Sequence, residues 1–99
     1  MVVGVLVADL LLGDVHSLKG KRSLVRPIVA ELRRRFQVAA AETGSEDLHR
    51  RAEISVSLVG NSHAHVHEVL ADCERLLAGR PEAELLSTRT RVLDDDDLG

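Results

Sequence analysis

The sequence predicts an α+β domain in which the elements follow the order β-α-β-β-α-β. Three observations lead to this prediction: an apolar strand at residues 2–12, two segments with helical spacing of apolar residues, and an alternating strand between them. The chain has 99 residues, 44% of them apolar and 29% charged, as in globular proteins. We expect one domain over residues 1–93 and an acidic disordered tail over residues 94–99.

The first strand is predicted at Val2 to Leu12, which is rich in β-branched and aliphatic residues and ends at the turn signal Gly13-Asp14. Both of its alternating faces are apolar. A strand of this kind is covered on both sides, so we expect it to be a central strand of the sheet.

The first helix is predicted from about Arg22 to Phe36, where apolar residues recur at helical spacing and form one buried stripe. Pro27 lacks a backbone donor, so the regular helix either begins close to Ser23 or is kinked. Arginines fall on another, exposed side of this helix: Arg22, Arg26 and Arg33.

The remaining elements follow in order. Residues 37–42 give a weak strand signal because alanine favours helix, and residues 52–60 alternate as a half-buried strand does. Residues 62–78 form the clearest helix, capped by Asn61 or Ser62 and stopped by Gly79 and Pro81. Residues 84–93 form the last strand.

This order is the ferredoxin-like arrangement, in which two helices cover one face of a four-stranded antiparallel sheet with the spatial order 4-1-3-2. The other face is bare in a monomer and includes an apolar row of the first strand. Exposed apolar patches mark interfaces. We therefore expect a homodimer through the open sheet face, or another partner on that face.

The net charge of −3 is unevenly distributed. Residues 15–51 hold nine Lys and Arg against four acids, whereas the acidic run lies at residues 94–97. A terminal run of like charge is usually solvated; the alternative is a tail that folds back on the basic segment and competes with an anionic partner.

The composition also indicates where the protein acts. The longest uncharged apolar stretch, residues 1–8, is too short to span a bilayer and lacks the basic start of a signal peptide. A single cysteine, Cys73, fits a reducing compartment. We expect a cytoplasmic protein without a membrane partner.

Several segments resemble the YlxP-like family of small bacterial proteins. They are DVHSLKGKRS from Asp14, VRPI from Val25, LRRRF from Leu32, and Ala52 to Asn61 running into Ala64-His65-Val66. Gly20 departs from the family pattern, which has an acidic residue there. The resemblance implies a ferredoxin-like fold and no established activity. The genes of this family lie beside those of transcription, initiation and ribosome-maturation factors, which is an association and not a mechanism.

Two segments are candidates for anion binding. Treating the first and third strands as parallel neighbours, we expect the loop 13–22 to meet the turn 60–63, where two helix N-termini favour a phosphate. The basic helix adds a strip suited to an RNA backbone. The alternative is that the serines are only caps and the cations only solvated. The candidate residues are His16, Ser17, Lys19, Lys21, Arg22, Arg26, Arg33, Arg34, Arg35, Asn61, Ser62 and His63.

A metal, a cofactor or a catalytic residue is not expected. His63 and His67 share a helix face, but two imidazoles need further ligands, such as Asp14 or His16, to hold zinc. Cys73 lies on an apolar stripe, where a thiol behaves as a small hydrophobe. The serines lack an acid to orient a nearby histidine.

The sequence therefore favours a non-enzymatic accessory protein that docks on structured RNA, as on rRNA or a ribosomal particle, through residues 16–35. Phe36 is the single aromatic residue, so base stacking is disfavoured. One alternative is a dimeric module that binds a small phosphorylated ligand between His16 and Asn61. A weaker one is an acylphosphatase-like hydrolase using Arg22 and Asn61, although the glycine-rich phosphate cradle is absent.

Overall fold

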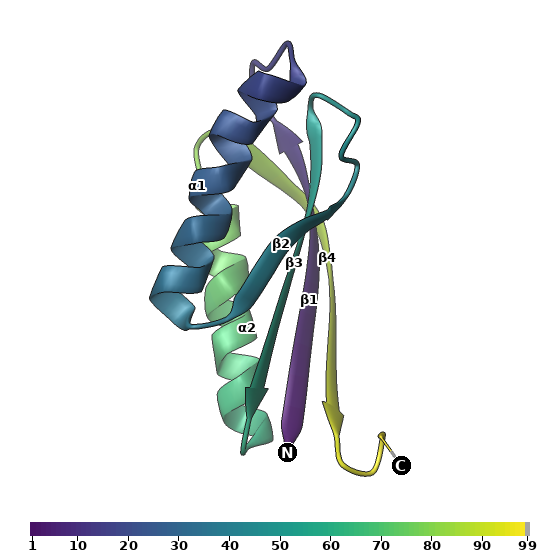
Figure 1. The fold of residues 1–99 in the computed structure, drawn as a ribbon. Coiled ribbons are helices and arrows are strands. Elements are labelled where there is room, and N and C mark those ends of the chain that lie inside the picture. The colour runs from purple at the N-terminus through teal and green to yellow at the C-terminus, as the bar shows by residue number, and fades with distance from the viewer. Residues whose placement is uncertain (99) are drawn as a thin grey trace.

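The structure, a computed structural model, describes residues 1–98 and confirms the predicted ferredoxin-like α+β fold (Figure 1). Gly99, the last residue of the predicted tail, lies outside the described residues. No helix within residues 1–98 combines the length and the apolar composition that crossing a bilayer requires. The elements are β1 (Val2–Leu12), α1 (Leu18–Phe36), β2 (Ala39–Gly44), β3 (Arg51–Gly60), α2 (His63–Ala78) and β4 (Ala83–Asp94).

The four strands form one antiparallel sheet in the order β2-β3-β1-β4, which is the predicted order. β1 is central, as its two apolar faces predicted. Its first residue, Val2, pairs with Gly60 of β3 on one side and with Asp94 of β4 on the other. Both helices lie on the same face of the sheet (Figure 1).

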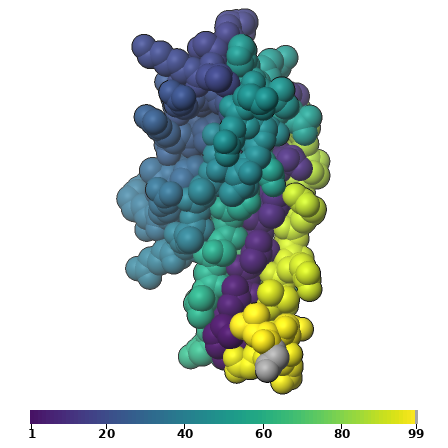
Figure 2. Space-filling view, turned by 45° about the vertical axis from the view of Figure 1, so that its right-hand side comes forward, coloured from purple at the N-terminus to yellow at the C-terminus, as the bar shows by residue number. Residues whose placement is uncertain are grey.

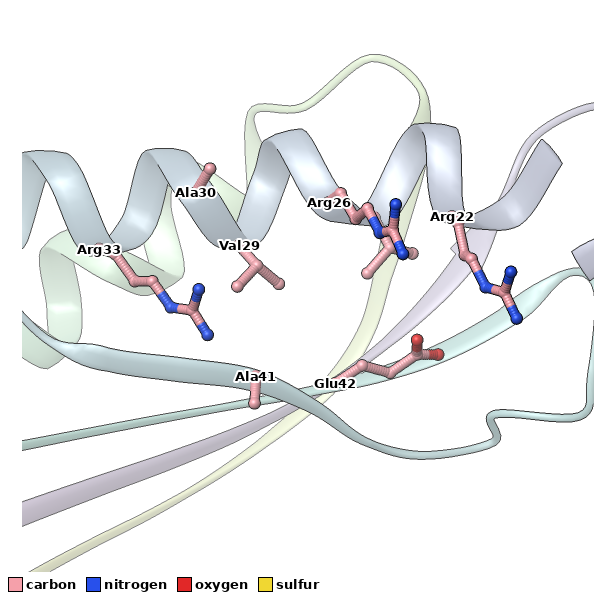
Figure 3. A pocket seen from close by; sticks show the side chains of 8 residues that line it. Arg22, Arg26, Val29, Ala30, Arg33, Ala41 and Glu42 are labelled. Atoms are coloured by element: carbon pink, nitrogen blue, oxygen red, sulfur yellow. The ribbon is translucent and has the colours of Figure 1, made fainter. Parts of the chain in front are cut away.

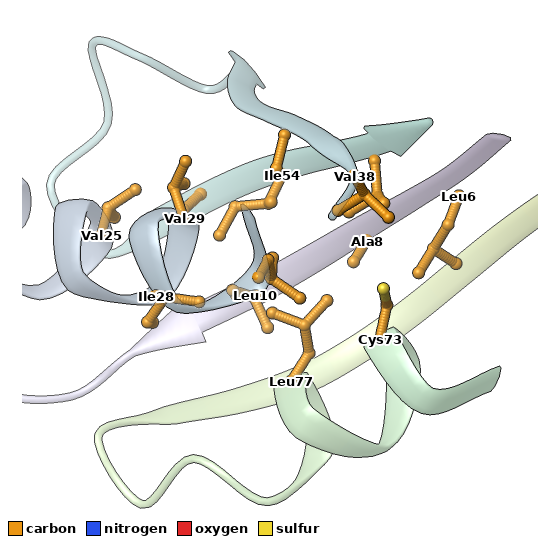
Figure 4. Packing of buried hydrophobic residues seen from close by; sticks show 14 of the residues in the cluster. Leu6, Ala8, Leu10, Val25, Ile28, Val29, Val38, Ile54, Cys73 and Leu77 are labelled. Atoms are coloured by element: carbon orange, nitrogen blue, oxygen red, sulfur yellow. The ribbon is translucent and has the colours of Figure 1, made fainter. Parts of the chain in front are cut away.

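The hydrophobic core lies between the sheet and the two helices (Figure 4). Even-numbered residues of β1 point into it, among them Leu6, Ala8 and Leu10, which are fully buried. They meet apolar side chains of both helices, including Ile28 and Leu77. Odd-numbered residues of β1 are half-buried because they face the opposite, uncovered side of the sheet.

The first helix begins earlier than predicted. The Ser17 side chain caps it by accepting a 3.0 Å hydrogen bond from the Gly20 N–H, so Pro27 lies inside the helix rather than in its first turn. The interpretation that the helix begins close to Ser23 is therefore wrong. The cap satisfies the first turn, and burial of apolar residues on both sides of Pro27 holds the helix together despite the missing donor.

Two strand boundaries also differ. β2 runs from Ala39 to Gly44 because Gln37, in the left-handed region with φ 55°, ends α1 and turns the chain toward the sheet. β4 extends to Asp94, so this residue belongs to the strand and not to the predicted tail. Asp95 to Leu98 form a turn, in which Asp97 accepts a 2.8 Å bond from the Asp94 N–H.

Candidate anion-binding groove

The two loops that were predicted to meet lie at opposite ends of the molecule (Figure 1). β1 and β3 are antiparallel, and Leu11 near the end of β1 pairs with Arg51 at the start of β3. The prediction of parallel neighbours was wrong because the α1 crossover makes β1 and β2 parallel, and β3 returns between them in the opposite direction. The combined pocket of His16 and Asn61 therefore does not form.

Both alternative functions that depended on this pocket therefore lose the site on which they rested. A small phosphorylated ligand cannot be held jointly by His16 and Asn61 across the length of the molecule. The hydrolase hypothesis required Arg22 and Asn61 to act on one phosphate, but Arg22 lies near the start of α1 and Asn61 follows β3 at the other end.

At the first end, the loop residues are largely engaged with one another. His16 Nε2 lies 2.8 Å from Asp14 Oδ1, and both side chains are exposed. Ser17 acts as the helix cap, and Lys19 is exposed in the first turn. His16 and Ser17 therefore have local partners, as the capping alternative expected for the serine.

At the other end, Ser62 caps α2 by accepting a 3.1 Å bond from the His65 N–H, and Asn61 is exposed. His63 Nε2 lies 3.3 Å from Asp94 Oδ2. Desolvation raises the pKa of Asp94, but hydrogen bonds from the chain after it and from His63 lower the pKa below its usual value. Within residues 1–98, no group of three His, Cys, Asp or Glu side chains is placed to hold a metal.

The prediction that Lys21 binds an anion is also wrong, because its side chain is buried and not available to a ligand. Its side chain is 2% exposed, and its Nζ lies 2.7 Å from Glu42 Oε2 and donates to the Ser45 carbonyl. The spacing of the sequence contains the signal for this placement: Lys21 precedes the buried Val25 by four residues, so the two share the inner face of α1.

The strongest cationic feature is a groove between α1 and the edge strand β2, which we call the Arg groove (Figure 3). Arg22, Arg26 and Arg33 line its helical side and extend toward Ala41 and Glu42 of β2. These arginines lie within about 40° of one another around the helix axis. The groove encloses about 550 Å³.

The groove is cationic because its one carboxylate is already paired. Glu42 faces the buried Lys21, whereas none of the ion pairs within residues 1–98 involves Arg22 or Arg26. Arg33 is partly engaged, since its Nε donates a 2.9 Å bond to the Ala40 carbonyl on β2. This bond fixes the side chain and leaves its two terminal amino groups as donors.

The other predicted helix cations lie outside the groove. Arg34 is exposed and 3.9 Å from Glu31, which also receives a 2.7 Å bond from Arg80. Arg35 stacks on Phe36, with its guanidinium carbon 5.3 Å from the ring centre. The sequence predicted the three groove arginines on one exposed side, but the β2 wall opposite them depends on the tertiary fold.

The groove suits phosphate oxygens. Each guanidinium presents a planar fork of donors that matches a phosphate, and the spacing along the helix is about 6 Å from Arg22 to Arg26 and about 10 Å from Arg26 to Arg33. Between them, Val29 and Ala30 keep the surface apolar. The described lining residues include no serine, cysteine or histidine that would act as a nucleophile or base.

The fold and the groove define a small ferredoxin-like domain with a cationic helical surface. Residues 3–90 match the model of the family described as "Protein of unknown function (DUF503)", and the chain belongs to this family. It is similar to the uncharacterized protein YlxP of Bacillus subtilis (strain 168), with 26% identity over 88 residues that cover 89% of this chain and 96% of the relative. These comparisons confirm the YlxP-like resemblance, and neither description states an activity.

Proposed function

We propose that the protein is a non-enzymatic, cytoplasmic accessory protein that binds structured RNA, such as a folded region of rRNA in a ribosomal particle, through the Arg groove. The observation that supports this is the row of arginines on one side of α1, of which Arg22 and Arg26 have no ion-pair partner within residues 1–98. Exposed Lys19, Arg34 and Arg35 extend the same helix's positive surface at both ends.

The chemistry favours an RNA backbone over unpaired bases. The groove row spans about 16 Å along the helix, long enough to follow several phosphates of one strand. The single ring of the chain, Phe36, is half-buried and lies under Arg35, so it offers little surface for stacking on a base. Binding should therefore depend on RNA shape and on salt rather than on sequence.

Filter binding to rRNA fragments at two salt concentrations tests the proposal. Three phosphate contacts should weaken wild-type binding by roughly 30-fold between 50 and 200 mM salt. Arg26→Gln should weaken binding at low salt and reduce the salt dependence by about one contact. Arg75→Gln is the control for loss of one charge, because Arg75 is also exposed on a helix but lies outside the groove, where it pairs with Asp72.

Two results would contradict RNA binding by the groove. One is an absence of affinity for rRNA at low salt. The other is an equal loss of affinity in the Arg26→Gln and Arg75→Gln variants, which would mean that the RNA responds to total charge and not to the groove.

A further inference from the structure

The sheet face opposite the helices has an apolar centre. The odd-numbered residues of β1 face this side and are half-buried, including Val3, Val5, Val7 and Leu11. Figure 2 shows β1 reaching the surface as a strip between β3 and β4. Beside Val5, small side chains of β2 and β3 leave a shallow hollow of about 260 Å³. Such a surface accepts a second packed layer.

The positive and negative charges on this sheet face are equal in number. By strand register, Arg51, Arg89 and Arg91 point to the same side as Val5, and so do three carboxylates, Asp9, Glu53 and Glu84. Inside one molecule, Arg89 lies 3.4 Å from Glu53, and the Ser87 hydroxyl donates to Asp9. A neutral face with an apolar centre suits a protein layer better than a nucleic acid.

The open sheet face is also large enough to form a specific protein interface. Four strands spaced by about 4.8 Å and ten residues at about 3.3 Å each give a surface of roughly 600 Å² for one molecule. Two such faces together exceed the roughly 1,000 Å² that a specific interface needs.

The register makes the face complementary to itself. Arg91 lies beside Val5 and Glu84 beside Leu11, at equal distances on either side of the midpoint between Val7 and Asp9. Consider a two-fold axis that lies between the two faces and runs across the strands at this midpoint. This axis sets Arg91 opposite the partner's Glu84. It also sets Val7 opposite the partner's Asp9, and Arg89, on the next strand, lies in the same row as that carboxylate. Neither Arg91 nor Glu84 has an ion pair within residues 1–98 of one molecule.

We propose that a second copy of this chain covers the open sheet face in an antiparallel two-fold dimer, with Val5 of β1 packed against the partner's Leu11 and reciprocal Arg91–Glu84 pairs at the rim. The helices remain on the outside, so the dimer exposes an Arg groove on each of two opposite sides. The proposal rests on the sheet face alone and does not depend on RNA binding.

Sedimentation at micromolar concentration tests the dimer through a charge swap. The wild type should have twice the monomer mass. Arg91→Glu and Glu84→Arg should each weaken association by at least about tenfold, because two like-charge contacts replace two ion pairs. The double variant R91E/E84R should restore it. Arg75→Glu on α2 is the matched control and should leave the dimer unchanged.

Two controls distinguish a lost ion pair from a loss of folding. Circular dichroism establishes that each variant is folded, and the recovery of the double variant separates pairing from a general loss of stability. A wild type that remains monomeric overturns the proposal. A dimer that is indifferent to Arg91→Glu, or that the double variant does not restore, overturns this geometry.

Discussion

At the scale of single residues, the pair of Lys21 and Glu42 ties the first turn of α1 to the strand β2. The lysine is almost fully buried, its Nζ lies 2.7 Å from the carboxylate, and it also bonds to the Ser45 carbonyl just beyond β2. A buried charge is tolerated when an opposite charge and a hydrogen bond compensate it. This pair therefore holds one wall of the Arg groove against the other.

Removing one member of the pair should destabilise the fold. We expect Lys21→Ala to lower the free energy of unfolding by about 3–5 kcal/mol, because Glu42 would keep a partly buried charge without its partner. Urea unfolding measures this loss. Replacing both residues, as in K21M/E42L, should recover most of it, and Lys19→Ala should stay within about 0.5 kcal/mol of wild type. An unchanged Lys21→Ala variant would show that the pair is not structural.

At the scale of elements, a glycine contact sets the distance between α2 and β1. A Cβ on Gly4 would overlap Val66 Cγ1 and lie 2.9 Å from Leu70 Cδ1. On the neighbouring strand, a Cβ on Gly60 would lie 2.8 Å from the other methyl group of Val66. The helix approaches the sheet closely because neither glycine has a side chain.

Gly4→Ala should push α2 away from the sheet and lower the free energy of unfolding by about 1–3 kcal/mol, as overpacking of a core does. Gly13→Ala is the comparison, because its Cβ would lie 3.4 Å from the nearest atom, an ordinary contact. Thermal unfolding of the two variants distinguishes them. Equal melting temperatures would show that α2 moves freely over β1.

The elements also show how far sequence patterns reach. The bounds of β1 were predicted correctly, and those of α2 nearly so, because long apolar runs and an unbroken helical stripe are strong local signals. β2 was displaced by two residues because its alanines give no strand signal. Their placement comes from pairing with β3. The start of α1 was missed because Pro27 outweighed the cap at Ser17 in the prediction.

At the scale of the whole molecule, Cys73 reports on opening of the core. Its side chain is fully buried between α2 and the sheet. Burial, with a smaller contribution from Asp72, raises the pKa of the thiol from 9.0 to about 11. The thiolate is therefore scarce in the native state at neutral pH, and an alkylating reagent must wait for the core to open.

We expect alkylation of Cys73 by iodoacetamide at pH 8 to be slow in the native protein and fast in urea. Gly4→Ala should accelerate native labelling by about tenfold for each 1.4 kcal/mol of stability that it loses. Because the native pKa is raised, the thiol's contribution to stability is complete below pH 9 and is lost as the pH rises toward 11. The fall in unfolding free energy over this range should be smaller in Cys73→Ala. Native labelling as fast as in urea would contradict the burial of Cys73 in a closed core.

For the candidate site, the sequence alone placed Arg22, Arg26 and Arg33 on one exposed side of a helix, since helical spacing is a local property. The sequence did not predict that β2 forms the opposite wall of the groove or that Lys21 is buried. Those placements depend on which strand lies beside α1, and strand order brings together residues that are distant along the chain.

The sequence by itself determined the order of the elements, the central position of β1 and the family to which the chain belongs, because apolar periodicity and local motifs encode them directly. Only the tertiary structure decided which ends of the strands meet. The direction of β3 follows from the crossover of α1 and the return of the chain between β1 and β2, and this direction separates His16 from Asn61. It leaves α1 beside β2, where the arginines form the groove.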